Sequence, residues 1–385
     1  MKLLMITRTL AEFASIQGEI AEISKLGIDQ TVVSPRRWAG KDSEIKRVKP
    51  DGFELLFNDC WFSGTTSIRI GNHLHFYPGI GKVIGQQKWD LVHLDEEPFN
   101  PATYLALREC RKHDVPAIFT EWQNLNKWYP PPFNFFEKYV FANAAGAIPG
   151  SRECLDVLRH RGFRGPVAQI GHGLDPTVFR SEDATSLRRK LALEGSFVVG
   201  FIGRIHQEKG LDTLVKALAM IPKDSVLVFV GRGPYQAELE SMIRRLQIQE
   251  RIRWVPWVHS DEVVEYINAF DVLALPSRTR RNWKEQFGRV LIEAMACETC
   301  VIGSDSGEIP HTIGDAGLIF HEGDEQGLAD CLRRMMDDPA ECNALARRGR
   351  QRVLEHFTYA KVARHRVDFY RRICSGVDAM TEVAV

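Results

Sequence analysis

The sequence predicts an α/β protein with two similar halves, each a parallel sheet wrapped by helices. Short apolar runs alternate with helical stretches along the chain, which is typical of such sheets. The alternation starts again after a polar, loop-like stretch between about residues 172 and 196. A chain of 385 residues also exceeds one ordinary core, so two domains are the default expectation.

The first half begins with a buried strand and a helix that Gly27 ends. Its strands are expected at 2–7, 29–35, 90–94, 116–120 and 146–150. Helices are expected between them, among others at 17–27 and 101–114.

The second half repeats this order, with a helix expected at 210–221 after its first strand. Its strands are expected at 197–203, 225–231, 252–257, 271–277 and 299–304. Ligands of open parallel sheets bind beyond the carboxyl ends of the strands. Functional residues are therefore sought in the loops that directly follow strands.

Composition and charge exclude several classes of protein. Lys+Arg and Asp+Glu balance at 50 each, so no global field favours nucleic acid or an anionic membrane, and any such contact must be local. Apolar runs fall short of the roughly 20 residues of a membrane span. The stretch 1–13 resembles a buried strand more than a secretory signal.

The eight cysteines are scattered, which favours a reducing, cytoplasmic setting. Cys297 and Cys300 have C-x-x-C spacing, but a metal or redox role needs a second pair or nearby histidines at suitable spacing. None follows, so we interpret both as buried thiols.

Two cations follow the first strand of the second half. In "GRIHQEKG" (203–210), Arg204 and Lys209 bracket a turn at a helix start, where free N–H groups and the helix dipole favour anions. A guanidinium and an ammonium there suit a diphosphate. Gly203 and Gly231 end successive strands and would let the backbone approach a ligand. The alternative is a surface basic pair at an ordinary turn.

Two glutamates flank another helix start in "KEQFGRVLIEAM" (284–295). Glu285 precedes the turn at Phe287-Gly288 and can accept hydrogen bonds from sugar hydroxyls. Glu293 follows a little over two helical turns later, within reach of a ribose diol. The alternative is a capping carboxylate and a partly solvated glutamate.

Together these motifs carry a family resemblance. "GRIHQEKG", "VGRGP" (230–234), "DVLALPS" (271–277), the E-x7-E of Glu285 and Glu293, and "GSDSGEIP" (303–310) occur in the order seen in retaining glycosyltransferases of family 4. The chain resembles this family strongly over 197–358 and loosely before it.

The resemblance implies the GT-B fold, with two Rossmann-like domains whose parallel sheets face a central cleft. It implies an acceptor domain at 1–175, a nucleotide-sugar domain at 196–358, and a helix at 359–375 that returns to the first domain. It assigns the donor diphosphate to Arg204 and Lys209, the ribose to Glu293 and the sugar hydroxyls to Glu285. The remaining donor residues are Gly203, Gly231, Gln286, Phe287 and Gly288.

The acceptor residues are expected in the first half, at strand ends. The candidates are His93, Glu97, Glu121 and Asn124. Related enzymes often have a histidine where this chain has Glu121. Glu121 would take the acceptor proton or orient the acceptor hydroxyl, and the alternative is that it is a structural carboxylate. For His93, the alternative is a histidine whose hydrogen bonds are satisfied within the protein. The aromatic loop 121–139 suits sugar stacking or lipid contact as well as core packing.

Two further departures from the family pattern leave roles open. Gly18 stands alone where relatives have a glycine pair, and Glu308 and His311 lie in an altered "SGEIPH" motif. No Asp-x-Asp occurs, so we expect no metal and no cofactor, with the basic pair neutralising the leaving diphosphate.

The sequence thus predicts a retaining, metal-independent transferase. It would move a hexose from a UDP- or GDP-linked donor to a hydroxyl of a glycan or lipid-linked acceptor. We expect a cytoplasmic protein, with a peripheral contact at the inner membrane face left open and no nucleic acid partner. Two alternatives remain: a non-catalytic nucleotide-sugar-binding partner of a polysaccharide assembly complex, and a sugar-phosphate synthase of the same fold. A nicotinamide dehydrogenase is disfavoured because no G-x-G-x-x-G follows the first strand.

Overall fold

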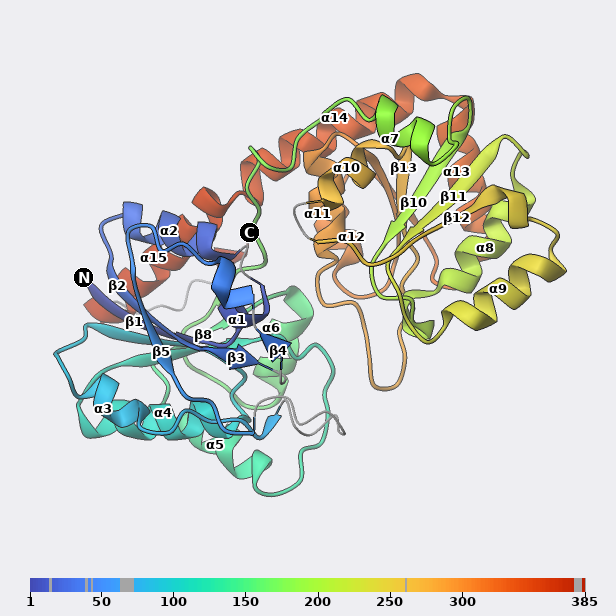
Figure 1. Ribbon diagram of the computed structural model, residues 1–385. Coiled ribbons are helices and arrows are strands. Elements are labelled where there is room, and N and C mark those ends of the chain that lie inside the picture. Colours follow the sequence, from blue (N-terminus) through green and yellow to red (C-terminus); the bar gives the residue numbers. More distant parts are fainter. Residues whose placement is uncertain are drawn as a thin grey trace. The chain divides into compact units, whose positions relative to one another are not determined.

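The chain forms two compact units, Met1–Gly173 with Tyr359–Val385, and Leu174–Thr358 (Figure 1). The computed structural model describes residues 1–13, 16–38, 41–42, 44–62, 73–259, 262–376 and 383–384. Each unit contains a six-stranded sheet, and the strand pairs of both sheets are parallel. The predicted fold class, two α/β halves with parallel sheets, is confirmed.

The sheet of the first unit has the order β5-β2-β1-β6-β7-β8. Its strands are β1 (Lys2–Thr7), β2 (Asp29–Pro35), β5 (Glu54–Asn58), β6 (Leu91–Asp95), β7 (Ala117–Glu121) and β8 (Gly146–Pro149). The order reverses between β1 and β6, so their following loops diverge and leave room for a ligand.

Helices cover both faces of this first sheet. Their bounds are α1 (Thr9–Glu12), α2 (Gln17–Lys25), α3 (Ile80–Ile84), α4 (Pro101–Lys112), α5 (Phe133–Asn143), α6 (Arg152–His160) and α15 (Tyr359–Ser375). Helices α2 and α15 lie side by side on one face, and α3, α4 and α5 cover the other (Figure 1).

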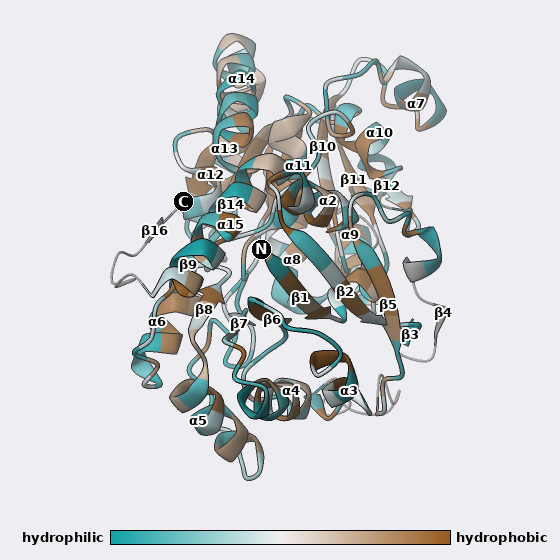
Figure 2. Cartoon of the chain, turned by 90° about the vertical axis from the view of Figure 1, so that its left-hand side faces the viewer, coloured by the Kyte–Doolittle hydropathy of each residue, from teal (hydrophilic) through white to brown (hydrophobic). Residues whose placement is uncertain are grey.

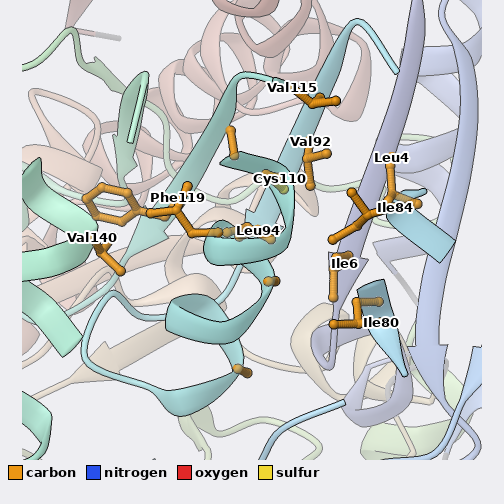
Figure 3. Packing of buried hydrophobic residues seen from close by; sticks show 14 of the residues in the cluster. Leu4, Ile6, Ile80, Ile84, Val92, Leu94, Cys110, Val115, Phe119 and Val140 are labelled. Atoms are coloured by element: carbon orange, nitrogen blue, oxygen red, sulfur yellow. The ribbon is translucent and has the colours of Figure 1, made fainter. Parts of the chain in front are cut away.

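The core follows from the alternation of side chains along the strands. Leu4 and Ile6 of β1 point with Val92 and Leu94 of β6 toward the α3–α5 side (Figure 3), whereas Leu3 and Met5 face α2 and α15 on the other side. Both faces are buried, which is why these strands are continuous apolar runs in the sequence. Figure 2 shows the hydrophobic colour concentrated on strands such as β1 and β6.

The sheet of the second unit has the order β12-β11-β10-β13-β14-β15, which reverses between β10 and β13. Its strands are β10 (Phe197–Ile202), β11 (Ser225–Val230), β12 (Ile252–Val255), β13 (Val272–Leu275), β14 (Cys300–Ser304) and β15 (Leu318–Phe320).

Helices also flank the second sheet, with α8 beside α9 and α13, and α11 beside α10 and α14 (Figure 1). The helices are α7 (Thr185–Lys190), α8 (Leu211–Met220), α9 (Gln236–Arg245), α10 (Val263–Asn268), α11 (Arg289–Ala296), α12 (Ile309–Ile313), α13 (Glu325–Asp337) and α14 (Pro339–His356).

Shorter elements complete the fold. They are β3 (Arg37–Trp38), β4 (Lys41–Asp42), β9 (Ala168–Gln169), β16 (Val383–Ala384) and the 3-10 turns η2 (Glu44–Arg47), η4 (Gln207–Lys209) and η5 (Gln249–Arg251). Across the described residues, no helix combines the length and apolar character that crossing a membrane requires.

Candidate active site

The loops after β10 and β13 meet where the strand order of the second unit reverses. Gly210 lies between them with a left-handed φ of 64°, and a Cβ there would stand 1.9 Å from the carbonyl oxygen of Pro276. The backbone N–H of Arg278 donates to the carbonyl oxygen of Glu208 at 2.8 Å. Backbone contact therefore sets the spacing between the loop that carries Lys209 and the segment that leads to Glu285.

Lys209 and Glu285 form the central ion pair of this site. The Nζ atom of Lys209 lies 2.6 Å from Oε2 of Glu285. The hydroxyl of Ser277 donates to the same oxygen at 2.7 Å. Glu285 is 8% exposed, so its charge is largely removed from water and depends on these partners. The structure thus brings together two residues that are 76 positions apart in the sequence.

The turn after Glu285 is held by the loop after β14. A Cβ on Gly307, which has φ 61°, would lie 2.0 Å from the carbonyl oxygen of Glu285. The hydroxyl of Thr312 donates to the carbonyl oxygen of Phe287 at 2.7 Å. Gly288 caps α11 with φ 80°. This fixes the main chain at the start of the helix, while the side chain of Gln286 is exposed.

The other predicted glutamate, Glu293, lies on α11 itself. Its Oε1 is 3.0 Å from Nε of Arg289, one helical turn earlier. Burial raises the pKa of the Glu293 carboxyl above its usual value. Its predicted contact with ribose stays a prediction.

Glu308 and His311, whose roles the sequence leaves open, belong to this region. Glu308 is buried, and its backbone N–H donates to the carbonyl oxygen of Glu285 at 3.3 Å. His311 lies on α12, and its carbonyl oxygen accepts from Arg352 at 2.7 Å. Glu308 thus contacts the turn that carries Glu285, whereas the exposed His311 is held through its main chain.

A pocket of about 560 Å³ opens beyond the ends of β10, β11 and β12. The exposed Arg204 and the predicted Gly203 and Gly231 are part of its wall. The full lining is Ile202, Gly203, Arg204, His206, Val230, Gly231, Arg232, Gly233, Trp257, Val258 and Val263. The pocket offers two guanidinium groups and an indole to a ligand.

A contact within the protein requires the glycines after β11, and their predicted approach to a ligand stays a prediction. A Cβ on Gly231 would lie 2.0 Å from the carbonyl oxygen of Gly203, and one on Gly233 would lie 2.1 Å from that of Ile205. The close approach that requires glycine is therefore between two neighbouring loops of the protein. Gly18 is a parallel case, because a Cβ there would meet the ring of Tyr359 at 2.8 Å.

The candidate acceptor residues Glu97 and Glu121 lie together in the first unit. Burial raises the pKa of both carboxyl groups, and a hydrogen bond between them favours a shared proton, since ionised carboxylates only accept. Backbone N–H groups of Trp122 and Gln123 donate to Glu97 and Glu121, respectively, at 3.2 and 2.8 Å. Asn124 is close in sequence, but its amide donates to Glu153 at 3.3 Å.

Replacing Glu121 by glutamine should flatten the pH dependence of stability. Burial, followed by the neighbouring Glu97, raises the pKa of the Glu121 carboxyl well above 4.5. The folded state therefore keeps a proton that the unfolded state loses, and wild-type stability falls as pH rises above about 4.5, by up to about 1.4 kcal/mol per pH unit. We expect the melting temperature of E121Q relative to wild type to increase between pH 5 and pH 9.

The matched control is E194Q, at a surface glutamate whose side chain is 61% exposed. Its difference from wild type should stay constant over the same pH range. A constant difference for E121Q as well, measured by scanning calorimetry, would mean that the carboxyl pair holds no extra proton in the folded state.

His93 lies in the interior of the first unit, whereas a residue that binds the acceptor must be accessible to it. It is fully buried, with Nε2 3.0 Å from Oγ1 of Thr120 and Nδ1 2.8 Å from Oη of Tyr370. Burial lowers the pKa of its imidazole to about 3. These contacts favour the alternative weighed for His93, a structurally satisfied histidine.

The aromatic loop is partly packed and partly exposed. Trp122 stacks on His172 with ring centroids 4.2 Å apart, and Tyr129 stacks on Phe99 at 4.4 Å. By contrast, Trp128 is 78% exposed and Phe135 56%. Packing against neighbouring rings therefore accounts for Trp122 and Tyr129, but not for the exposed Trp128 and Phe135.

The cysteines of the C-x-x-C pair are free and buried. Burial raises the pKa of the Cys297 thiol to about 12, which makes it a poor nucleophile or ligand. Among the residues that the structure describes, no group of three or more His, Cys, Asp or Glu side chains is arranged to hold a metal ion.

Sequence reasoning missed three residues of the site: Ser277, Trp257 of the pocket wall, and Trp283, whose ring centroid lies 4.8 Å from Nζ of Lys209. Ser277 is the first polar residue after the buried strand β13 and could have been found by that signal. Trp283 lies in a loop of irregular sequence, and Trp257 belonged to a predicted strand that ends earlier, at Val255.

Two family descriptions match the chain, one on each half. "Glycosyl transferases group 1" matches residues 183–352, and "Glycosyltransferase Family 4" matches residues 19–178. Together they span both units.

Curated relatives are similar over part of their length. A 2-deoxystreptamine glucosyltransferase of Streptomyces kanamyceticus is 27% identical over 270 residues, 67% of this chain and 68% of its own. An alpha-maltose-1-phosphate synthase of Mycolicibacterium smegmatis is 30% identical over 238 residues, 57% of this chain and 60% of its own. An N-acetyl-alpha-D-glucosaminyl L-malate synthase of Bacillus anthracis is 30% identical, with 49% of each chain covered.

Solved structures share the fold over nearly the whole chain. Anabaena HepE in complex with UDP has a TM-score of 0.74 and 20% identity, with 96% of this chain and 100% of that chain covered. The sucrose-phosphate synthase of Thermosynechococcus elongatus has the same TM-score and identity, with 98% of this chain and 100% of that chain covered. At this identity the likeness concerns the GT-B architecture.

Proposed function

The chain belongs to the glycosyl transferases group 1, glycosyltransferase family 4, with the GT-B fold, and from that premise we propose that it transfers a hexose from a nucleotide-diphosphate sugar to a hydroxyl group. The observation that carries the proposal is the Lys209–Glu285–Ser277 cluster at the strand-order reversal of the second unit. Lys209 lies in the same loop after β10 as Arg204, which is part of the pocket wall. The cations Arg204 and Lys209 suit the phosphates of a donor, and the buried carboxylate of Glu285 suits its sugar hydroxyls. The indole of Trp257 suits its base.

Each side chain has a role that its chemistry supports. Arg204 and Lys209 neutralise the diphosphate as the bond to the sugar breaks, which takes the place of a metal. Glu285 accepts hydrogen bonds from the sugar, and Glu293 from the ribose. The donor is UDP- or GDP-linked, and UDP is a ligand of the similar HepE structure.

We assign the acceptor to the first unit, near the carboxyl pair Glu97–Glu121. The exposed Trp128 and Phe135 support an acceptor that carries a glycan or a lipid. Retention of the anomeric configuration follows from the resemblance to the family, and its test is the anomeric coupling constant of the product.

A panel of UDP- and GDP-hexoses tests the donor assignment. We expect one nucleotide class to raise the melting temperature at millimolar concentration with EDTA present, because ligand binding stabilises by linkage. Slow release of free sugar should accompany binding. Binding without any release would support the non-catalytic alternative, and no binding to any member would contradict the proposal.

A sugar-phosphate synthase is the second candidate. The observation that favours this candidate is the 30% identity to an alpha-maltose-1-phosphate synthase. Adding glucose 1-phosphate and fructose 6-phosphate to the donor assay separates the two, since a synthase would release nucleotide diphosphate much faster with one of them.

A further inference from the structure

The loop between β13 and α11 turns back on itself beside the site. The backbone N–H of Arg280 donates to the carbonyl oxygen of Trp283 at 2.7 Å, and that of Trp283 donates back at 3.3 Å. The base of this hairpin is anchored, because Arg278 pairs with Asp212 at 2.9 Å. The hairpin therefore has a defined position relative to the sheet.

This turn brings the indole of Trp283 to Lys209. The Nζ atom of Lys209 lies 4.8 Å from the centroid of the Trp283 ring, within the range of a cation–π interaction. The same Nζ atom is 2.6 Å from Glu285. The ammonium group thus has both a carboxylate and an aromatic ring as neighbours, and the side chain of Lys209 is 14% exposed.

An unrestrained lysine would not keep this geometry. Its four-carbon stem carries about 2 kcal/mol of rotamer entropy, which must be lost when the ammonium engages a phosphate. A contact that orders the side chain beforehand lowers that cost when the ligand binds. The indole also excludes water from one side of the ion pair, which strengthens it.

We propose that Trp283 is a positioning residue of the donor site: it holds the ammonium of Lys209 beside Glu285 before the donor phosphates arrive. The inference rests on the proposed function, because it takes Lys209 as a ligand of the nucleotide diphosphate. It assigns a purpose to the hairpin Arg280–Trp283.

A double-mutant cycle tests the coupling between the two side chains. The affinities of UDP and GDP are measured by calorimetry for the full chain and for W283L, W283F, K209M and W283L/K209M. We expect W283L to bind the preferred nucleotide roughly 3- to 30-fold more weakly, the range of a cation–π contact. W283F should recover most of the loss, and W283L should add less than about twofold in the K209M background.

The matched control is W61L. Trp61 is 57% exposed, lies in the first unit and contacts Phe76, so its replacement should leave nucleotide affinity unchanged. If W283L binds as tightly as wild type, or weakens binding equally with and without Lys209, the positioning role is wrong while the donor site stands. If wild-type protein binds neither UDP nor GDP, the proposed function fails, and the inference fails with it.

Discussion

Lys209→Met should lower kcat/KM for sugar transfer by about 100- to 1,000-fold, the usual effect of removing one preorganised charge from a developing anion. The variant loses the cation that would contact the diphosphate. The Nζ atom of Lys209 is also the ion-pair partner of Glu285, at 2.6 Å. The variant therefore leaves a carboxylate of low exposure without its ion-pair partner, which should cost about 3 kcal/mol of stability. Initial rates and urea unfolding curves measure the two effects separately.

Two further variants keep these effects apart. K209M/E285Q removes the uncompensated charge, so its stability should recover while its activity stays lost. K216M is the matched control, because Lys216 lies on α8 and pairs with Glu325 at 3.3 Å, outside the site. If K209M turns over at the wild-type rate at a temperature where it is folded, the role assigned to Lys209 is refuted.

The sheets were predictable because burial on both faces leaves a strong record in the sequence. Strands such as 2–7 and 225–231 are continuous apolar runs, and the structure places β1 and β11 there to within a residue. The missed strands β5 and β15 are at sheet edges, where residues are partly exposed and the runs are short. Edge strands need tertiary pairing to be recognised.

The site was predictable only as far as loop positions go. The rule that ligands bind beyond strand ends located Lys209 and Glu285 in adjacent loops. It could not show that they pair directly, or that Trp283 folds back onto Lys209, because both contacts depend on loop conformation. The same limit explains Gly231, whose need for glycine comes from the backbone of Gly203 and cannot be read from its neighbours.

His93 and Glu121 illustrate the limit in the first unit. Both lie at or near strand ends, and this position, together with the family resemblance at Glu121, assigned both to the acceptor. The structure separates them, since His93 is enclosed by Thr120 and Tyr370, whereas Glu121 pairs with the half-buried Glu97 at the end of β7. Alternating side-chain direction along a strand decides such cases, and it requires the register of the sheet.

Gly210→Ala should disrupt the donor site through the backbone alone. The added Cβ would stand 1.9 Å from the carbonyl oxygen of Pro276, so one of the two loops must move. Because Lys209 is the adjacent residue, the shift should separate it from Glu285. We expect at least a 30-fold loss of UDP or GDP affinity and a stability loss of about 2–4 kcal/mol, from the clash and the left-handed backbone together.

The control isolates the backbone conformation from the clash. Gly195 of the same unit has φ 72°, close to the 64° of Gly210, but a Cβ there would meet nothing within 4 Å. G195A should therefore cost only the left-handed conformation, about 1 kcal/mol, and leave nucleotide affinity unchanged. If G210A resembles G195A in calorimetric affinity and in melting temperature, the packing of the β10 loop on the β13 loop does not set the geometry of the ion pair. If only G210A loses affinity, the contact between the two loops is what places Lys209 opposite Glu285.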